Sequence, residues 1–174
     1  MDGYSIPLDL FNFIKKNLPE GATLLELGSG AGSAELCKYY KLYSVEHAQE
    51  WVNKYPGVNY IYAPLKSHKQ VAKLTGTEWY DWSYVKPAIK NLDYQMILID
   101  GPPICHGRAG FAKYLDHFKI VPMVFDDLHR GRDLQVALKV SRRLQESITI
   151  IPTEEGRSWG YIWPKGSFAK QPNV

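Results

Sequence analysis

Short apolar runs alternate along most of this chain with longer segments in which apolar residues recur at helical spacing. The runs span four or five residues each, a length that is typical of buried strands. They predict strands at 23–27, 42–45, 58–62, 95–99, 122–125, 147–151 and 160–163. The segments between them predict helices at 8–18, 33–40, 49–55, 108–118 and 133–146. This alternation indicates a mostly parallel sheet that is covered by helices on both faces.

The last two runs, 147–151 and 160–163, look like a hairpin, so we expect the final strand to be antiparallel. The expected fold is therefore α/β, a three-layer, Rossmann-like, doubly wound sheet of about seven strands. A chain of 174 residues suits a single domain over 1–174. The segment between Leu65 and Asp93 breaks the rhythm, because it is polar and aromatic. We expect it to be either a functional excursion or a helix that its Trp residues pack on the sheet.

The composition is that of an ordinary globular domain. Hydrophobic residues make up 45% and charged residues 22%, which argues against a disordered or disulfide-stapled chain. The net charge of +3 is small and no basic run stands out, so we do not expect a nucleic-acid partner. Cys37 and Cys105 lack the spacing of a metal or disulfide framework. With no secretory signal pattern and no apolar run near the ~20 residues of a membrane span, the sequence predicts a soluble, cytoplasmic protein.

A glycine-rich loop joins the first predicted strand to the helix after it. Gly28, Gly30 and Gly32 would let the backbone turn sharply and approach a ligand closely. The N–H groups at the start of the following helix are free to bind a ligand. Glu46 ends the second predicted strand, 18 residues after Gly28, where a carboxylate can accept hydrogen bonds from both hydroxyls of a ribose. The combination predicts a nucleoside-containing cofactor.

The segment from Glu26 to Gly32 resembles motif I of the class I S-adenosylmethionine (SAM)-dependent methyltransferases, whose form is E-x-G-x-G-x-G. The residues Val45-Glu46-His47 look like the second acidic motif of that family. The resemblance covers most of the chain, since the expected strand order also fits. It implies SAM as the cofactor, with these residues at its binding site: Glu26, Gly28, Ser29, Gly30, Gly32, Ser33, Glu46, His47, Ala63 and Asp100. A NAD(P)-linked oxidoreductase is the alternative, which the dinucleotide fingerprint disfavours because it requires glycine where Ser33 stands.

Three aspartates follow two of the predicted strands. Asp100 ends the strand at 95–99, and Asp126 and Asp127 end the strand at 122–125. In a doubly wound sheet these strand ends are neighbours at the topological switch point, so the three carboxylates should converge. Their spacing resembles that of the catechol-type, divalent-metal-dependent O-methyltransferases. The resemblance implies Mg²⁺ or Mn²⁺ bound by Asp100, Asp126 and Asp127, where the metal would lower the pKa of an acceptor hydroxyl.

The sequence departs from the catechol-type pattern in its general base. Those enzymes usually carry a lysine shortly after the aspartate of the fourth strand, whereas Asp100 is followed by 101–108 without a lysine. His129 and His106 are the bases on offer, and a metal-free reaction with His129 or Asp100 as base stays open. We take Asp100, Asp127 and His129 as the catalytic candidates. Alternatively, the aspartates could cap the following helix and bind nothing.

Two groups of side chains could contact a methyl acceptor or close the site. Arg108, Arg130 and Arg132 flank the same strand ends and would either bind an anionic group or pair with surface acids. Aromatic side chains could stack on a sugar ring, form a lid or close the cofactor site. They belong to the segment 79–84 and to Tyr4, Phe11 and Phe13.

These patterns together predict transfer of a methyl group from SAM to a hydroxyl of a small molecule or glycan. The strand end Asp100-Gly101-Pro102-Pro103 and the later Asp-Asp-x-His-Arg motif look like those of glycan-modifying O-methyltransferases, which favours a saccharide acceptor. Two further alternatives stay open. One is a metal-independent methyltransferase that acts on nitrogen in protein or nucleic acid, and the other is a SAM-binding module without catalysis.

Overall fold

The computed structural model describes residues 6–67, 78–103, 105–167 and 172 of the chain. The helices are α1 (Leu8–Asn17), α2 (Ala31–Leu36), α3 (Trp82–Ile89), α4 (Ala109–Lys113) and α5 (Gly131–Leu144), with short 3₁₀ helices η1 (Gln49–Trp51) and η2 (Leu115–His117). The strands are β1 (Thr23–Leu27), β2 (Lys41–Glu46), β3 (Asn59–Tyr62), β4 (Leu65–Ser67), β5 (Glu78–Tyr80), β6 (Met96–Ile99), β7 (Met123–Phe125), β8 (Ile148–Pro152) and β9 (Ser158–Ile162).

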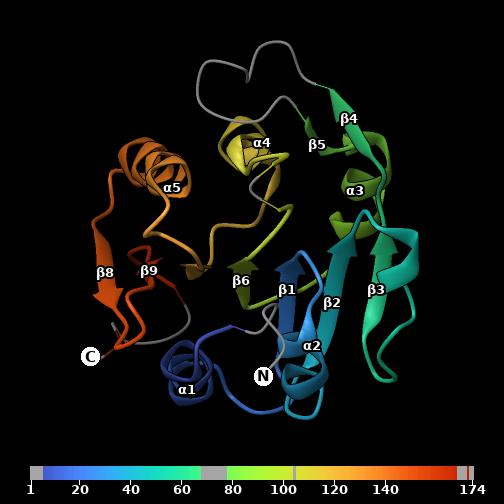
Figure 1. Ribbon diagram of the computed structural model, residues 1–174, viewed down its shortest axis with the longest axis horizontal. Coiled ribbons are helices and arrows are strands. Elements are labelled where there is room, and N and C mark those ends of the chain that lie inside the picture. Colours follow the sequence, from blue (N-terminus) through green and yellow to red (C-terminus); the bar gives the residue numbers. More distant parts are fainter. Residues whose placement is uncertain (1–5, 68–77, 104, 168–171, 173–174) are drawn as a thin grey trace.

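Within the described residues, seven strands form one mixed sheet in the order β3-β2-β1-β6-β7-β9-β8 (Figure 1). The strands β3, β2, β1, β6 and β7 run parallel to one another, and β9 runs antiparallel to both β7 and β8. Successive strands extend the sheet to one side of β1 and then to the other, so the topological switch point lies between β1 and β6. The expected doubly wound sheet with an antiparallel last strand is confirmed.

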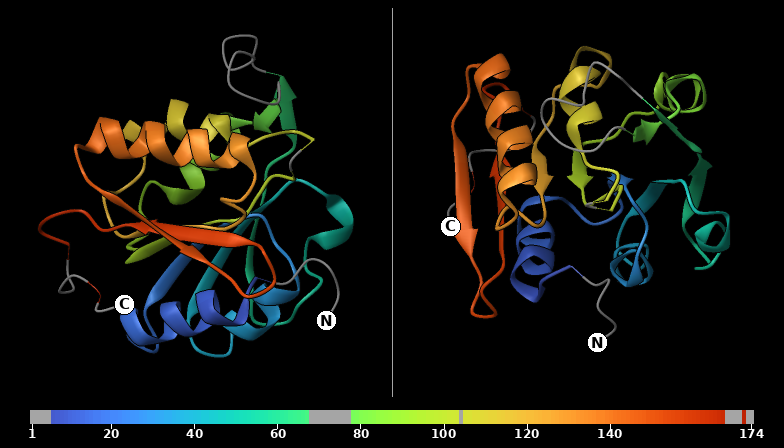
Figure 2. Two further views of the ribbon diagram at one scale, coloured as in Figure 1. Left: turned by 60° about the vertical axis from the view of Figure 1, so that its left-hand side comes forward. Right: turned by 45° about the horizontal axis from the view of Figure 1, so that its top comes forward.

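Helices cover both faces of the sheet, with α1 and α2 on one side and α3, α4 and α5 on the other (Figure 2). Each face has its own apolar core, and successive strand residues contribute to opposite cores. In β6, Ile97 and Ile99 join the core under α3, α4 and α5, whereas Met96 and Leu98 join the core over α1 and α2. The strand therefore reads as an unbroken apolar run because both of its faces are buried.

Three of the expected helices are shorter than their apolar pattern suggests, and the one expected at 33–40 is α2, which ends at Leu36. The segment 49–55 holds only the 3₁₀ turn η1, since Val52 has extended backbone and Asn53 has a left-handed φ of 63°. The segment 108–118 divides into α4 and η2, because Tyr114 between them leaves the helical conformation with φ −98° and ψ 13°. Local turns of this kind leave the hydrophobic spacing intact and so escape a reading based on periodicity.

The excursion after β3 is a two-stranded ribbon, β4 and β5, that is followed by α3. Trp79 is 1% exposed and packs against Gly110 so closely that a Cβ there would lie 2.0 Å from the Trp79 Cγ. Trp82 stacks on Tyr114 with 4.6 Å between ring centroids. Both rings thus pack inside the fold, as the second alternative expects, but only Trp82 belongs to a helix, because Trp79 lies on β5. Neither ring is presented as a lid or a sugar platform. Tyr84 is exposed, and residues 68–77 lie outside the described part of the chain.

The aromatic residues of α1 pack on the sheet and do not close the cleft described below. Phe13 stacks on Tyr161 of β9, with ring centroids 4.7 Å apart, and Phe11 meets Tyr39 edge to face. The expectation that these two rings close the cofactor site is thus wrong, and Tyr4 lies outside the described residues. In the part of the chain that the structure describes, no helix is both long and apolar enough to cross a membrane.

Candidate functional site

A cleft of about 600 Å³ lies at the carboxyl ends of the parallel strands, where doubly wound folds bind their ligands. Most of the residues that line it were expected at the site from the sequence. These are Gly28, Ser29, Glu46, His47, Asp100, Arg108, Asp126, Asp127, His129 and Arg130. Sequence analysis missed further lining residues, namely Ala48, Glu50, Trp51 and Arg157.

The glycine loop begins with a backbone turn that only glycine accepts easily. Gly28 has a φ of +93°, and a Cβ on this residue would lie 2.6 Å from the Cα of Gly101. The loop after β1 therefore touches the loop after β6. This contact brings the glycine loop and the Asp100 strand end to one place, which joins the expected cofactor and acceptor regions in a single cleft.

Glu26 supports the loop from beneath. The Ser33 hydroxyl donates to the Glu26 Oε2 at 2.7 Å, and the Gly30 N–H donates to the Ser33 Oγ at 3.0 Å. Burial raises the pKa of Glu26 to about 8, although the Ser33 hydrogen bond acts in the opposite direction. Glu26, Gly30, Gly32 and Ser33 are all buried and do not line the cleft. The structure therefore places these four residues beneath the surface of the cleft, where they support the part of the glycine loop that lines it.

Glu46 ends β2 at the wall of the cleft, with its carboxylate fixed by backbone donors. Its Oε2 accepts the Ser29 N–H at 2.8 Å, and its Oε1 accepts the N–H groups of His47 and Ala48 at 2.7 Å each. Burial alone would raise the pKa of Glu46, but the His47 ring and the backbone donors outweigh it and hold the pKa below its ordinary value. Ala63 is fully buried behind Glu46, and its N–H donates to the Glu46 carbonyl.

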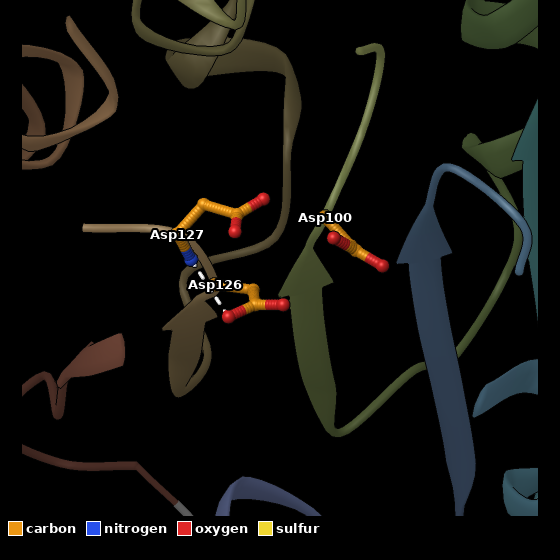
Figure 3. Close-up of side chains that lie close together, drawn as sticks. All are labelled: Asp100, Asp126 and Asp127. Atoms are coloured by element: carbon orange, nitrogen blue, oxygen red, sulfur yellow. Dashed lines mark hydrogen bonds between the residues drawn. The ribbon is translucent and has the colours of Figure 1, made fainter. Parts of the chain in front are cut away.

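The three aspartates converge as expected. Oxygen atoms from Asp100, Asp126 and Asp127, one from each carboxyl group, lie within 4.8 Å of one another (Figure 3). Asp127 has a left-handed φ of 62°, and its N–H donates to the Asp126 Oδ1 at 2.7 Å, so the two neighbouring carboxylates are turned to different directions. Burial, with Asp126 and Asp127 adding to it, raises the pKa of Asp100 to about 7 despite the nearby Arg108.

Arginine side chains neutralise much of this acidic cluster. Arg108 is 2% exposed, and its guanidinium donates to the Asp127 Oδ2 at 2.9 Å and to the main-chain carbonyl of Asp126 at 2.7 Å. Arg130 donates to the same Asp127 Oδ2 at 2.6 Å. The expectation that these arginines flank the strand ends is confirmed, and both pair with the site's own acids. Arg132, by contrast, is exposed and does not line the cleft.

Arg157 reaches the cluster from the turn between β8 and β9. Its Nη2 lies 2.7 Å from the Asp126 Oδ2 and 3.2 Å from the Asp127 Oδ1. No local sequence motif marks Arg157 as a site residue, but the sheet topology places it near the end of β7. Because β9 is antiparallel to β7, the beginning of β9 lies beside the end of β7, where Phe125 pairs with Gly160. A charged residue just before β9 must therefore fall close to Asp126.

Of the two histidines considered as bases, His129 lines the cleft and His106 does not. The His106 ring is instead engaged by Glu78 of β5. His129 lies two residues after Asp127 in the chain, so it stays a candidate for proton transfer. The two bases that the sequence offers for a metal-free reaction, His129 and Asp100, both line the cleft.

No protein-family model and no curated protein sequence matches this chain. Solved structures do. The O-methyltransferase TomG of Streptomyces achromogenes, involved in tomaymycin synthesis and solved with SAM, is 11% identical over 95% of this chain and 84% of that one, with a TM-score of 0.64. An O-methyltransferase of Bacillus cereus, solved with SAH, is 11% identical over 94% and 84%, with a TM-score of 0.62. A precorrin-6y C5,15-methyltransferase of Geobacter metallireducens is 12% identical over 94% and 95%, with a TM-score of 0.56. The chain therefore has the Rossmann-like fold of the class I SAM-dependent methyltransferases.

Proposed function

We propose that this protein transfers a methyl group from SAM to a hydroxyl group of a small molecule or glycan. One observation carries the proposal. Glu46, held ionised by backbone donors, and Asp100, whose carboxyl group has a raised pKa, line the same cleft. The first suits a cofactor ribose and the second suits an acceptor hydroxyl. The same fold occurs in O-methyltransferases solved with SAM or SAH, which supports this activity.

The residues present fit SAM as the cofactor. The Glu46 Oε2 accepts one backbone N–H, from Ser29, and has a second lone pair that can accept from a ribose hydroxyl, whereas Oε1 already accepts two backbone N–H groups. Gly28, Ser29 and His47 line the cleft beside it and would contact the rest of the cofactor. Glu26, Gly30, Gly32 and Ser33 would hold the glycine loop in shape. Ala63 would support Glu46 from behind. When bound, SAM supplies a methyl group that its sulfonium activates.

Asp100 would accept the proton of the acceptor hydroxyl. A carboxyl group with a pKa of about 7 is partly ionised near neutral pH and can still take up a proton, as a general base must. The hydroxyl oxygen, having lost its proton to Asp100, would then form the new bond to the methyl carbon as the bond from that carbon to the sulfonium sulfur breaks and S-adenosylhomocysteine leaves. His129 is the alternative base in the same cleft, and Asp127 would orient the acceptor through its oxygens.

The polar wall of the cleft favours an acceptor that is rich in hydroxyl groups. Carboxylates and guanidinium groups stand side by side there, so neighbouring hydroxyls could donate to the first and accept from the second. A saccharide meets both needs, whereas the Trp79 ring is buried in the core and the partly buried Trp82 ring stacks on Tyr114, so neither supports stacking on a sugar. Cys37 and Cys105 are both free thiols, which suits the cytoplasmic location that we propose for the reaction.

Assistance by Mg²⁺ or Mn²⁺ is the part of the sequence prediction that the donor set fits least well. The three carboxyl groups are close enough to share one ion. The oxygens of Asp126 and Asp127, however, already accept from Arg108, Arg130, Arg157 and a backbone N–H. A divalent ion would have to displace these donors, so the proposed reaction uses none.

Calorimetric titration of the whole chain with SAM and, separately, with NADPH tests the proposal first. We expect saturable binding of SAM and none of NADPH. Transfer of label from methyl-labelled SAM to saccharides and catechols, with peptides and nucleic acids as competing acceptors, tests it next. Failure of the folded protein to bind SAM would overturn the proposal. Label found on nitrogen of a peptide or nucleic acid would replace it with the N-methyltransferase alternative.

A further inference from the structure

We propose that Arg157 occupies the cation position between Asp126 and Asp127, so that the cleft works without a bound divalent metal ion. The inference rests on the proposed function in one respect, namely that this cleft is the site of methyl transfer. Its central measurement, however, is metal binding, which does not depend on SAM or on an acceptor. It departs from the expectation that the three aspartates bind Mg²⁺ or Mn²⁺.

The geometry of Arg157 is that of a bridging cation. A single nitrogen, Nη2, lies 2.7 Å from the Asp126 Oδ2 and 3.2 Å from the Asp127 Oδ1. A metal ion shared by these two carboxylates would have to stand where this nitrogen stands. The remaining oxygens of the pair are engaged as well, because the Asp126 Oδ1 accepts a backbone N–H and the Asp127 Oδ2 accepts from Arg108 and Arg130.

The charge balance around the cluster leads to the same conclusion. Four acidic side chains meet here, and three arginines pair with them, which leaves a formal charge of −1 if all the acids are ionised. The acids are Asp100, Asp126, Asp127 and Asp133, and the arginines are Arg108, Arg130 and Arg157. A divalent ion added to this set would leave an excess positive charge in a largely buried place. Without Arg157 the same set would carry −2, which one divalent ion would neutralise.

The backbone around Arg157 is fixed, so the guanidinium is delivered by a defined turn. The Arg157 N–H donates to the Thr153 Oγ1 at 3.1 Å, and the Arg157 carbonyl accepts the Thr153 N–H at 2.9 Å. The side chain is 28% exposed and lines the cleft, so an acceptor could contact it directly. A guanidinium in this place would stabilise negative charge that develops on a hydroxyl oxygen as its proton leaves, which is a role that metal ions serve elsewhere.

Mn²⁺ binding by the whole chain, measured by electron paramagnetic resonance and by calorimetry, tests the inference. We compare the wild type with Arg157→Met, and we use Arg132→Met as the control because Arg132 is an exposed arginine outside the cleft. The expected result is at least a tenfold gain in Mn²⁺ affinity for Arg157→Met and none for the control. Adding Asp126→Asn to Arg157→Met should remove the gain, because the ion then loses a carboxylate.

Two outcomes would overturn the inference. One is wild-type protein that binds Mn²⁺ as tightly as Arg157→Met does, and the other is an Arg157→Met variant that is folded but gains no affinity. If Arg157→Met fails to fold, Arg157→Gln takes its place, since it removes the charge and keeps a polar side chain. SAM binding is measured in parallel on every variant. If the wild type does not bind SAM, only the proposed function is overturned. If the wild type binds Mn²⁺ strongly, only this inference is overturned.

Discussion

The pKa values of the two glutamates that the sequence assigns to the cofactor site are shifted in opposite directions. Glu26 is enclosed beneath the glycine loop, and burial raises its pKa to about 8. Glu46 is also buried, but the His47 ring and the N–H groups of Ala48 and Ser29 bring its pKa below the ordinary value. The motifs around both residues are recognisable from the sequence. Which carboxyl group keeps its proton was not predictable, because it depends on where the backbone N–H groups point.

The raised pKa of Glu26 predicts a specific pH dependence of stability. Between pH 4.5 and about 8 the unfolded chain has released this proton while the folded chain keeps it, so the free energy of unfolding falls as the pH rises through that window. The slope due to this one group is at most about 1.4 kcal/mol per pH unit. Glu26→Gln removes it, so the variant should gain stability relative to the wild type from pH 5 to pH 8 in urea unfolding.

The control for this measurement is Glu35→Gln, because Glu35 is exposed on α2 and outside the cleft. Its unfolding curves should shift with pH as those of the wild type do. Stability differences between Glu26→Gln and the wild type that stay constant over the whole range would contradict a protonated Glu26.

Glu46→Gln should weaken SAM binding. The substitution removes the charge that we expect to accept from the ribose hydroxyls, and a hydrogen bond to a charged group contributes about 1.5–3 kcal/mol. The dissociation constant should therefore rise by roughly ten- to a hundredfold. Calorimetry on the variant, on the wild type and on Glu35→Gln measures this. Unchanged affinity in a folded Glu46→Gln protein would remove Glu46 from the cofactor site.

At the scale of elements, the apolar runs locate each strand of the large sheet to within about two residues, whereas helical spacing overestimates three helices. Continuous apolar runs identify strands well, because β6 and its neighbours are buried on both faces. Helical spacing alone does not reveal that Asn53 or Tyr114 interrupts the backbone. The role of the aromatic residues between β3 and β6 was ambiguous from the sequence, because Trp side chains occur both in protein cores and at binding surfaces.

The contact between the loops after β1 and β6 predicts a strong effect for Gly28→Ala. The new Cβ would meet the Gly101 backbone at 2.6 Å, and the φ of +93° disfavours any L-residue. We expect the variant to lose on the order of 2 kcal/mol or more of unfolding free energy, together with SAM affinity. Chemical denaturation and calorimetry give the two quantities.

Gly131→Ala is the matched control for Gly28→Ala. Gly131 begins α5, and no atom lies within 4 Å of the Cβ that alanine would add. Alanine favours helix over glycine by up to about 1 kcal/mol, so this variant should be as stable as the wild type or slightly more stable. Equal losses in the two variants would argue against the close contact of the strand-end loops.

At the scale of the whole molecule, the cleft is assembled from segments distant in the sequence that the topology brings together. The convergence of Asp100 with Asp126 and Asp127 was predictable, because the ends of neighbouring parallel strands meet at a switch point. Arg157 lies in the turn of the expected hairpin, but the sequence alone does not show that its side chain reaches Asp126. The pairing of Arg108 with Asp100, Asp127 and Asp133 together escaped prediction as well, since it depends on side-chain packing that no spacing rule describes.

Ligand binding should stabilise the molecule as a whole. SAM at a hundred times its dissociation constant would raise the free energy of unfolding by about 2.7 kcal/mol. For a domain of this size that corresponds to a rise of roughly 5–10 °C in Tm. Scanning fluorimetry with SAM, SAH and NADPH measures the shift, and we expect no effect of NADPH. A rise with NADPH and none with SAM would favour the oxidoreductase alternative.

The hairpin that carries Arg157 has a consequence for how the protein is made. The ribosome releases Asp127 thirty residues before Arg157, and Trp159, which donates to Asp9 of α1, comes 150 residues after its partner. At ~5–20 residues per second, the acidic cluster waits seconds in the nascent chain for the guanidinium that bridges it. The same late segment inserts β9 beside β7 and ties down the first helix. The same segment of chain therefore adds β9 to the sheet and Arg157 to the charge balance of the cleft.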